Sequence, residues 1–555
     1  MLEKLDFEVA PITKEEYKPV HDELVNKLIV LQQQAHSKGI GLVVLFEGWN
    51  GAGRGGRISD LLYKLDARHT SVHVTEKFDV KNAKRFRKMD QGVADYFPEM
   101  QQFWKSLDMR GNMTIYCRGW YDMAVSKLFH ATSKEEAEKI FEESVKSFES
   151  FEHQLTADGY IVVKFFLHIS QKTQARRLKA LGKNKATAWR LEPGALDRLD
   201  DYTDYYKIFD NMLSSTNFDD SQWVLVNAED RRRSNLTIAR TLVTALDEAV
   251  NRGADPEAAA AAAKAAANSA GEAERDESDE RTRTPEEQAA VRERNEALAQ
   301  VQAAAAPRTS RFQIEPDYPT LKGVDYHLRL DPETYKEELK REQKKLYELE
   351  LEMYRKRVPL IIMYEGQDAA GKGGSIKRVA QALDARSYTI FPSPAPTKPE
   401  LLHPFLWRYW TRLPKAGHVG IYDRSWYGRV LVERVEGFAS PGEWARAYDE
   451  INEFERDLVN WGAILLKFWV EIDRDEQLNR FNARAEDPNK TWKITDEDWR
   501  NRDKYPQYRE AVEDMFRLTS TEFAPWIILE SNDKRYARIK ALKFINRALE
   551  QRLHG

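Results

Sequence analysis

The sequence predicts an α/β protein in which two tandem domains each form a parallel β-sheet flanked by helices. Three observations predict it. An internal repeat covers most of the 555 residues, short apolar segments alternate with longer amphipathic ones, and a glycine-rich loop follows the first apolar segment of each copy. Short apolar strands separated by helices are typical of a buried parallel sheet. Such a sheet binds its ligands beyond the carboxyl ends of the strands.

The internal repeat is a colinear series of matches. Residues 47–56 align with residues 365–374 at a spacing of 318 positions. Aromatic residues recur at spacings of 318, 306 and 303: Tyr17 with Tyr335, Trp104 with Trp410, Trp120 with Trp426, and Trp223 with Trp526. A series of this length indicates a duplication.

Each copy is predicted to alternate strands and helices. An amphipathic helix is expected over 14–36 and again over 333–356, each followed by an apolar strand, 42–46 or 360–364, and then by the glycine-rich loop. Further strands are expected at 72–75, 113–116, 161–166 and 223–226 in the first copy, and at 389–391, 419–422, 464–470 and 526–529 in the second.

The segment between the copies has a different composition. Residues 258–263 are all alanine, and residues 272–283 are dense in both charges. Neither stretch has the apolar density to build a core, although alanine favours local helix. We therefore predict a flexible or partly helical linker over 251–320, between domains at 1–250 and 321–555.

Composition limits the class of protein. Apolar residues make up 42% and charged residues 32% of the chain, as in ordinary soluble proteins. No apolar run approaches the ~20 residues that cross a bilayer, and residues 1–11 show no signal pattern. The single cysteine, Cys117, excludes an intrachain disulfide and a cysteine-based metal site. With a net charge of −4, we expect a cytoplasmic protein that binds neither nucleic acid nor membrane.

A glycine-rich loop in the second copy is the first candidate site. Gly366, Gly371 and Gly373 lie between an apolar strand and a helix, the context that makes a phosphate-binding P-loop (Walker A) pattern credible. Backbone N–H groups of such a loop surround phosphate oxygens, and Lys372 would bring a positive charge to the terminal phosphates. Because Gly373 stands where the common motif has a magnesium-binding Ser or Thr, Asp368 is the candidate for that role.

A second motif follows the strand predicted over 419–422. Asp423 ends this strand, where P-loop enzymes place a carboxylate that coordinates magnesium or holds the phosphoryl acceptor. Arg424 favours a phosphate site over a solvated strand end. Trp426 and Tyr427 could stack on a base, but we favour the interpretation that they are core residues. Charged residues on the following helix support a functional site: Arg429, Glu433 and Arg434.

A third segment, 480–493, is rich in basic residues and lies between predicted strands. It contains Arg484, Lys490 and Lys493. Such a segment is typical of a lid that closes over phosphates, with arginine forks that neutralise charge on the transferring group. The alternative is a solvated helix face.

Together these motifs resemble the second polyphosphate kinase family in its fused two-domain form. The resemblance covers nearly all of both copies except the linker. It implies two tandem P-loop kinase-like domains, each with a helical lid. It also implies transfer of the terminal phosphate of inorganic polyphosphate to AMP, assisted by Mg²⁺ or Mn²⁺, to give ADP.

The resemblance also implies roles for particular residues. Catalytic roles fall on Asp368, Lys372, Asp423 and Arg484, and the metal ligands are Asp368 and Asp423. Phosphate-binding roles fall on Gly366, Gly371, Gly373, Arg424, Lys377, Arg378, Arg408, Arg412, Lys490 and Lys493.

The first copy differs at all four catalytic positions. They are occupied by Asn50, Arg54, Cys117 and Leu181. Asn and Cys lack the negative charge that a hard cation requires. The first copy is therefore expected to be a non-catalytic structural or binding partner, with Cys117 a small core residue rather than a nucleophile.

Other functions stay open at this point. The acceptor could be ADP or GDP, or the reaction could run in reverse, since motif spacing does not decide among nucleotides. A regulator that binds polyphosphate or nucleotide without turnover, and an ordinary ATP-dependent kinase of small molecules, are further alternatives. Duplicated units often pair again, so a homo-oligomer is also possible.

Overall fold

The computed structural model describes residues 1–63, 65–75, 97–183, 199–251, 309–486 and 496–555, together with positions 185, 188 and 307. Most of the predicted linker, and the lid residues Lys490 and Lys493, lie outside the described residues. The described residues divide into two compact units. The first holds the first copy with Pro399–Pro404, and the second holds the second copy with residues 97–101. The exact domain boundaries given above remain a prediction.

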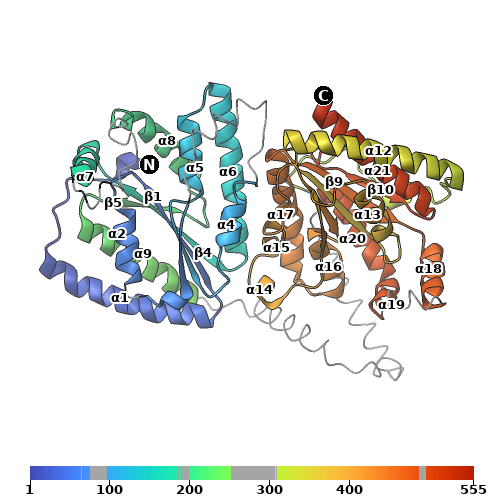
Figure 1. Cartoon of the computed structure of the whole chain (residues 1–555). Coiled ribbons are helices and arrows are strands. Elements are labelled where there is room, and N and C mark those ends of the chain that lie inside the picture. Colours follow the sequence, from blue (N-terminus) through green and yellow to red (C-terminus); the bar gives the residue numbers. More distant parts are fainter. Residues whose placement is uncertain are drawn as a thin grey trace, which may run out of the picture. The chain divides into compact units, whose positions relative to one another are not determined.

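The first unit is a five-stranded parallel sheet of order β2-β3-β1-β4-β5 between helices (Figure 1). Its strands are β1 Gly41–Gly48, β2 Thr70–Val74, β3 Met113–Cys117, β4 Tyr160–His168 and β5 Trp223–Asn227. Its helices are η1 Leu2–Lys4, α1 Lys14–Ser37, α2 Arg54–Leu62, η2 Ala67–His69, α4 Gln101–Ser106, α5 Trp120–Phe129, α6 Lys134–Ala157, α7 Gln171–Lys183, α8 Tyr202–Ser215 and α9 Arg231–Asn251.

The second unit repeats this architecture, with strand order β10-β9-β6-β8-β7 and all pairs parallel. Its strands are β6 Leu360–Gly366, β7 Tyr388–Pro392, β8 Val419–Asp423, β9 Ile464–Glu471 and β10 Trp526–Glu530. Its helices are η5 Leu321–Gly323, α12 Pro332–Lys356, α13 Lys372–Ala380, α14 Lys398–Leu401, α15 Trp407–Trp410, η6 Trp426–Val430, α16 Val432–Glu436, α17 Pro441–Asn460, α18 Arg474–Glu486, α19 Asp496–Asp503, α20 Tyr505–Thr519 and α21 Lys534–His554. The predicted α/β fold class is confirmed.

Local sequence signals explain where the long helices begin. Asp331 caps α12 by accepting hydrogen bonds from two backbone N–H groups, and Pro332 follows at the first helical position. Ser440 and Glu443 form a reciprocal capping box at the start of α17. These caps satisfy backbone donors that have no partner within the helix.

A buried ion pair lies behind the sheet of the second unit. Lys467 on β9 and Glu455 on α17 are both fully buried, with Nζ 2.8 Å from Oε2. Lys467 Nζ also donates to the carbonyl of Thr519, at the end of α20, over 2.6 Å. Glu455 Oε1 accepts hydrogen bonds from Trp426 Nε1 at 3.0 Å and Tyr427 OH at 2.8 Å. The pair therefore connects the turn after β8 to β9, to α17 and to the end of α20.

The first unit contains the same network. Lys164 Nζ lies 2.7 Å from Glu152 Oε2, and both side chains are fully buried. Trp120 and Tyr121 donate to Glu152 Oε1 at 2.9 and 2.6 Å. The prediction that Trp426 and Tyr427 are core residues is confirmed, since both have zero exposure.

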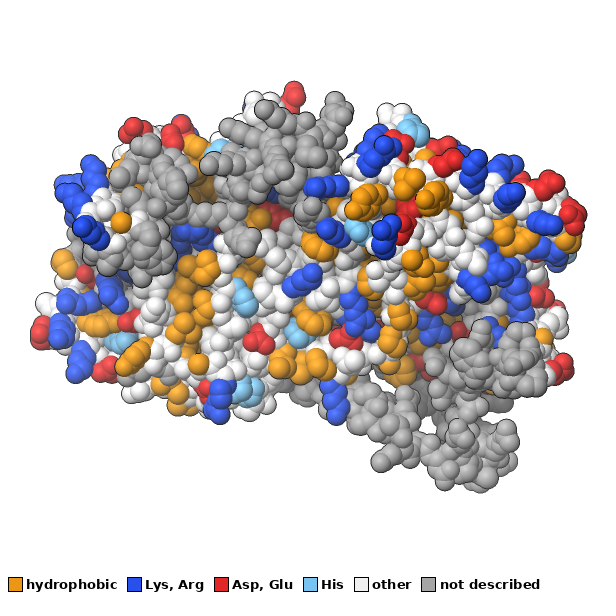
Figure 2. Space-filling model, in the orientation of Figure 1, with side chains coloured by type: hydrophobic (Ala, Val, Ile, Leu, Met, Phe, Trp, Pro, Cys, Tyr) orange, Lys and Arg blue, Asp and Glu red, His pale blue; other side chains and the backbone are white. Residues whose placement is uncertain are grey.

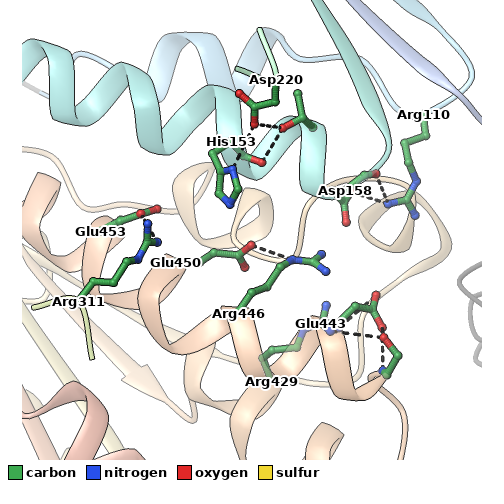
Figure 3. Close-up of polar contacts among 12 residues, drawn as sticks. Arg110, His153, Asp158, Asp220, Arg311, Arg429, Glu443, Arg446, Glu450 and Glu453 are labelled. Carbon is green, nitrogen blue, oxygen red and sulfur yellow. Dashed lines mark hydrogen bonds and ion pairs between the residues drawn. The ribbon is translucent and has the colours of Figure 1, made fainter. Parts of the chain in front are cut away.

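Further ion pairs connect the helices next to this network. Arg429 lies between Glu433 and Glu443, while Arg434 donates to Tyr448 and Asp514. Figure 3 shows Arg429 beside Glu443, and Arg446 paired with Glu450 along α17. Arg429 and Arg434 thus join helices next to the strand end at Asp423, where the sequence indicated only a functional site.

Among the described residues, no helix combines the length and the apolar character needed to cross a bilayer.

We predict that Lys467→Met destabilises the second unit by about 3–5 kcal/mol, because Glu455 would keep its buried charge without a partner. Urea unfolding followed by tryptophan fluorescence measures this loss. Lys164→Met is the matched variant and should destabilise the first unit by a similar amount. An unchanged midpoint for both variants would contradict a structural role for the pairs.

Candidate active site

The glycine-rich loop of the second unit begins where β6 ends. Gly366 has a φ of 143°, and a Cβ there would lie 2.3 Å from the carbonyl oxygen of Val470 on β9. Gly371 has a φ of 113° and precedes the first turn of α13. Only glycine adopts a backbone conformation with such a positive φ without strain. The loop thus places its backbone N–H groups at the N-terminus of a helix, as anion binding requires.

Lys372 lies over this loop. Its Nζ donates to the carbonyl of Gly366 at 2.5 Å and to that of Gln367 at 3.1 Å. Burial lowers the pKa of Lys372, and the negative charges of Asp368 and Asp423 oppose that change. The ammonium group therefore lies among the loop carbonyls and between the two carboxylates.

The two acidic residues lie at the carboxyl ends of neighbouring strands. Asp368 accepts hydrogen bonds from Arg424 Nη2 at 3.0 Å and from Asn501 Nδ2 at 2.8 Å. Burial opposes ionisation of Asp368, but Lys372 and Arg424 hold its pKa below the usual value. Asp423 is half-buried at the end of β8, the neighbour of β6. The arrangement keeps negative charge beside a phosphate-binding loop.

Arg480 supports the loop from behind, a role that sequence reasoning missed. Its guanidinium donates to the carbonyls of Ala369 at 2.9 Å, Ala370 at 2.8 Å and Ser531 at 2.5 Å. In the first unit Arg177 donates in the same way to loop and strand-end carbonyls. The presence of an arginine at this position in both copies was the sequence signal that could have indicated a structural role.

Glu365 has a comparable supporting role. It accepts hydrogen bonds from Ser425 N at 2.7 Å and Ser425 Oγ at 2.8 Å, and burial raises its pKa. It thereby joins the loop strand to the turn after Asp423. Glu47 holds Gly119 in the same way in the first unit.

Basic side chains gather around the N-terminus of α13. Arg484 lies in the last turn of α18, and its charge acts on Lys534 at the start of α21. A Cβ on Gly374 would lie 2.9 Å from Arg538 Nη2. Lys377 lies on α13 and is exposed. Lys534 and Arg538 were not predicted, because α21 lies more than 150 residues after the loop in the sequence. Figure 2 shows groups of Lys and Arg side chains on the visible face of this unit.

The remaining predicted residues fall in several places. Arg378 donates weakly to the carbonyl of Gly374 at 3.4 Å, and Gly373 is exposed with open space around it. Arg408 is buried and lines the pocket described next. The carbonyl of Arg412 accepts a hydrogen bond from Tyr422 OH. Lys490 and Lys493 lie outside the described residues.

A pocket of about 440 Å³ adjoins the loop within the second unit. Its polar lining includes Asp368, Arg424, Asn501 and Arg509, together with Glu365, Gln367, Arg408 and Glu433. Its apolar lining comes from Leu321, Pro394, Pro396, Leu431, Val432, Phe438 and Val512. An apolar pocket with a few convergent polar groups is the usual form of a small-molecule site.

Aromatic rings occupy the equivalent positions of the first unit. Trp49, which replaces Gln367, stacks on Tyr202 with ring centres 4.0 Å apart and meets Phe209 at 5.0 Å. Phe209 also contacts Phe166 at 5.0 Å. These rings occupy positions that correspond to Gln367, Tyr505, Val512 and Trp469, which line the pocket of the second unit.

The catalytic positions of the first unit have also changed their contacts. Arg54 bonds to the carbonyl of Gly48 and to Asn50 Oδ1. Cys117 is half-buried rather than a fully buried core residue, because it lies at the carboxyl end of β3, where the strand stops. Burial raises the pKa of its thiol, which disfavours the thiolate that a nucleophile needs.

The sequence of this chain matches one known protein family. The family model described as "Polyphosphate kinase 2" matches residues 11–253 and 329–554. A polyphosphate:AMP phosphotransferase of Pseudomonas syringae pv. tomato is 35% identical over 96% of this chain and 94% of its own length. One from Pseudomonas aeruginosa is 36% identical over the same shares. A GDP-polyphosphate phosphotransferase of Mycolicibacterium smegmatis is 39% identical over 40% of this chain and 79% of its own.

A solved structure agrees with these sequence matches. The crystal structure titled putative polyphosphate kinase 2 from Pseudomonas aeruginosa superposes with a TM-score of 0.77 at 32% identity. The match covers 100% of this chain and 99% of the other.

We predict that Gly366→Ala weakens binding of inorganic tripolyphosphate at least about tenfold, because the new Cβ would collide with the backbone of β9 and displace the loop. Isothermal titration calorimetry measures the affinity. Gly48→Ala makes the same collision with Leu167 in the first unit and should leave the affinity unchanged. Equal losses in both variants would show that the loop of the second unit is not the main binding site.

Proposed function

This chain belongs to the polyphosphate kinase 2 family, and on that premise we propose that it transfers the terminal phosphate of inorganic polyphosphate to AMP, giving ADP. The observation that carries the proposal is the extent of the similarity. Relatives named polyphosphate:AMP phosphotransferases match 94–96% of the chain, including both copies. Relatives named for GDP, NDP or ADP match 33–47% of it.

AMP fits the pocket beside the loop. Its base and ribose would lie against the apolar lining and the tyrosines of α20, and its phosphate would point toward Arg424 and Lys372. Polyphosphate would approach from the opposite side, along the basic residues of α13, α18 and α21. This arrangement brings an acceptor oxygen and a terminal phosphoryl group together at the N-terminus of α13.

In the transfer, an oxygen of the AMP phosphate attacks the terminal phosphorus of polyphosphate. The bond between that phosphorus and the bridging oxygen breaks, and polyphosphate shortened by one phosphate leaves with that oxygen on its new terminal phosphate. Lys372 and Arg484 would stabilise charge on the transferring group, and the loop N–H groups would hold its oxygens. Little covalent chemistry is needed, so positioning supplies most of the rate.

A divalent cation, Mg²⁺ or Mn²⁺, fits the carboxylates of Asp368 and Asp423. Both side chains offer hard oxygen ligands at adjacent strand ends, and the first copy has lost both charges. The described residues contain no cluster of three or more His, Cys, Asp or Glu side chains able to hold an ion, so phosphate oxygens and water would complete the ligands. When bound, the cation would neutralise charge on the phosphates.

A second acceptor is favoured by one observation. The GDP-polyphosphate phosphotransferase of Mycolicibacterium smegmatis is more identical over its matched region than the AMP relatives are over the full chain. GDP or ADP is therefore the alternative acceptor. The cytoplasmic location and self-association expected from the sequence stay predictions.

We predict that Asp423→Asn lowers the rate of ADP formation about 100- to 1,000-fold, because the site would lose a metal ligand at the reacting phosphates. Purified protein, Mg²⁺, polyphosphate and AMP suffice for the assay, with nucleotides separated by chromatography. Cys117→Ser is the matched variant in the first copy and should keep the full rate.

The products separate the alternatives. If the unchanged protein phosphorylates GDP or ADP but not AMP, the acceptor assignment is wrong while the site assignment stands. If it binds nucleotide without transferring phosphate to any acceptor, the binding-regulator interpretation takes its place.

We also predict that AMP binds with a stoichiometry of one per chain, because aromatic rings fill the equivalent space of the first unit. Calorimetric titration measures this number. Two equivalent AMP sites per chain would contradict the interpretation that the first unit has lost its pocket.

A further inference from the structure

One buried carboxylate near the pocket has no part in the transfer described above. Glu471 ends β9 and has zero exposure. It accepts hydrogen bonds from Trp469 Nε1 at 2.7 Å, Tyr326 OH at 3.0 Å and Gln367 Nε2 at 3.1 Å, and Arg509 Nη1 lies 3.8 Å away. A buried charge is costly, and so many donors around one carboxylate indicate a side chain with a defined task.

The partners of Glu471 come from separate parts of the second unit. Gln367 belongs to the phosphate-binding loop and is the residue before Asp368. Arg509 lies on α20 and lines the pocket, as Gln367 and Trp469 do. Tyr326 lies on the segment between η5 and α12. Glu471 therefore joins the loop to the opposite wall of the pocket.

The first unit replaces these polar residues together. Gln367, Glu471 and Arg509 correspond to Trp49, His168 and Tyr206 in the repeat. Trp49 Nε1 donates to His168 Nδ1 at 2.8 Å, and Tyr206 lies against the same imidazole at 5.9 Å. Where the carboxylate is absent, aromatic rings stack at the corresponding positions. The polar set is thus specific to the second copy, in which these positions line a pocket.

We propose that Glu471 is a positioning residue for the nucleotide acceptor, which holds Arg509 and Gln367 at the pocket so that Arg509 contacts the bound AMP. This inference rests on the proposed function, because it names how the same site selects its acceptor. Arg509 is half-buried, donates to Tyr505 OH at 3.2 Å and also interacts with Tyr326, so these tyrosines and Glu471 hold its guanidinium at the pocket wall. Loss of the carboxylate would leave only the two tyrosines.

The pH dependence of AMP binding provides a second, independent measure of the role of Glu471. Burial raises the pKa of Glu471 to about 7, while hydrogen bonds from Trp469 and Tyr326 and the charge of Arg509 oppose the rise. The titratable or charged side chains that face it are Tyr326 and Arg509. Because only the ionised carboxylate attracts Arg509, AMP affinity should increase as the pH rises through about 7.

Ionisation of Glu471, which should strengthen AMP binding, lowers the stability of the folded protein. A carboxyl group with a raised pKa in the folded state binds more protons there than in the unfolded chain. Its contribution to stability is therefore lost as the pH rises through about 7. Replacing it by a neutral isostere should remove this loss.

The test is Glu471→Gln, measured by calorimetric binding of AMP and by steady-state kinetics. We expect the dissociation constant and KM for AMP to rise about tenfold, with KM for polyphosphate unchanged. The increase in AMP affinity between about pH 6 and pH 8 should be smaller than in the unchanged protein. The part that remains comes from the second ionisation of the AMP phosphate, whose pKa is about 6. The melting temperature above pH 7 should stay the same or rise, which excludes simple misfolding. His168→Gln, the matched variant, should change none of these.

A double-mutant cycle with Arg509→Gln completes the test. Both single variants should weaken AMP binding, and the double variant should be no weaker than Arg509→Gln alone. Additive effects, equal losses for AMP and polyphosphate, or an unchanged pH dependence in Glu471→Gln would overturn the positioning role. If the unchanged protein binds polyphosphate but not AMP, the acceptor assignment fails and this inference fails with it. Normal AMP binding that is unaffected by Glu471→Gln overturns this inference alone.

Discussion

The buried pair of Lys467 and Glu455 is the constraint on which the geometry of the second unit depends. An ion pair without exposure is costly unless every polar atom has a partner. Here the lysine bonds to Glu455, Tyr427 and the carbonyl of Thr519, and the glutamate accepts from Trp426 and Tyr427. These contacts fix the turn that follows β8, so they also fix the direction in which Asp423 and Arg424 leave the sheet.

The turn itself shows this constraint. Arg424 has a φ of 61°, which side-chain-bearing residues rarely adopt, and Arg118 at the same position of the first unit has a φ of 65°. Both units therefore hold the same strained turn with the same buried pair. The strain places Arg424 within hydrogen-bond distance of Asp368 in the second unit. Rigid surroundings are what allow such backbone to persist at a site.

Because the two units share the same supporting contacts, the differences between them distinguish residues that hold the loop from residues proposed to act on phosphate. Arg480 and Glu365 have counterparts that make the same contacts in the first unit, and they hold the loop in both. Asp368 and Asp423 have no charged counterpart in the first unit. Among the described residues, the first unit keeps the packing and has stacked rings at positions that line the pocket of the second unit. The contacts that support the fold can therefore be kept while the charged residues beside the loop change.

The sequence by itself determined the duplication, the order of strands and helices, and the loop with its lysine, because these features depend on residues close together in the chain. Periodic apolar segments and helix caps are local signals, and glycines at fixed spacing constrain only the backbone around them. The prediction of Trp426 and Tyr427 as core residues likewise followed from their place beside a strand.

Only the tertiary structure decided which distant side chains complete the site. Asn501, Lys534, Arg538, Glu471 and Arg509 lie on later elements of the second copy, and none of them belongs to a motif. Their positions follow from packing at the carboxyl edge of a parallel sheet, where residues from separate strands and helices meet. The aromatic stack of the first unit is of the same kind, since it depends on the packing of Trp49 against Tyr202, which no local sequence pattern encodes.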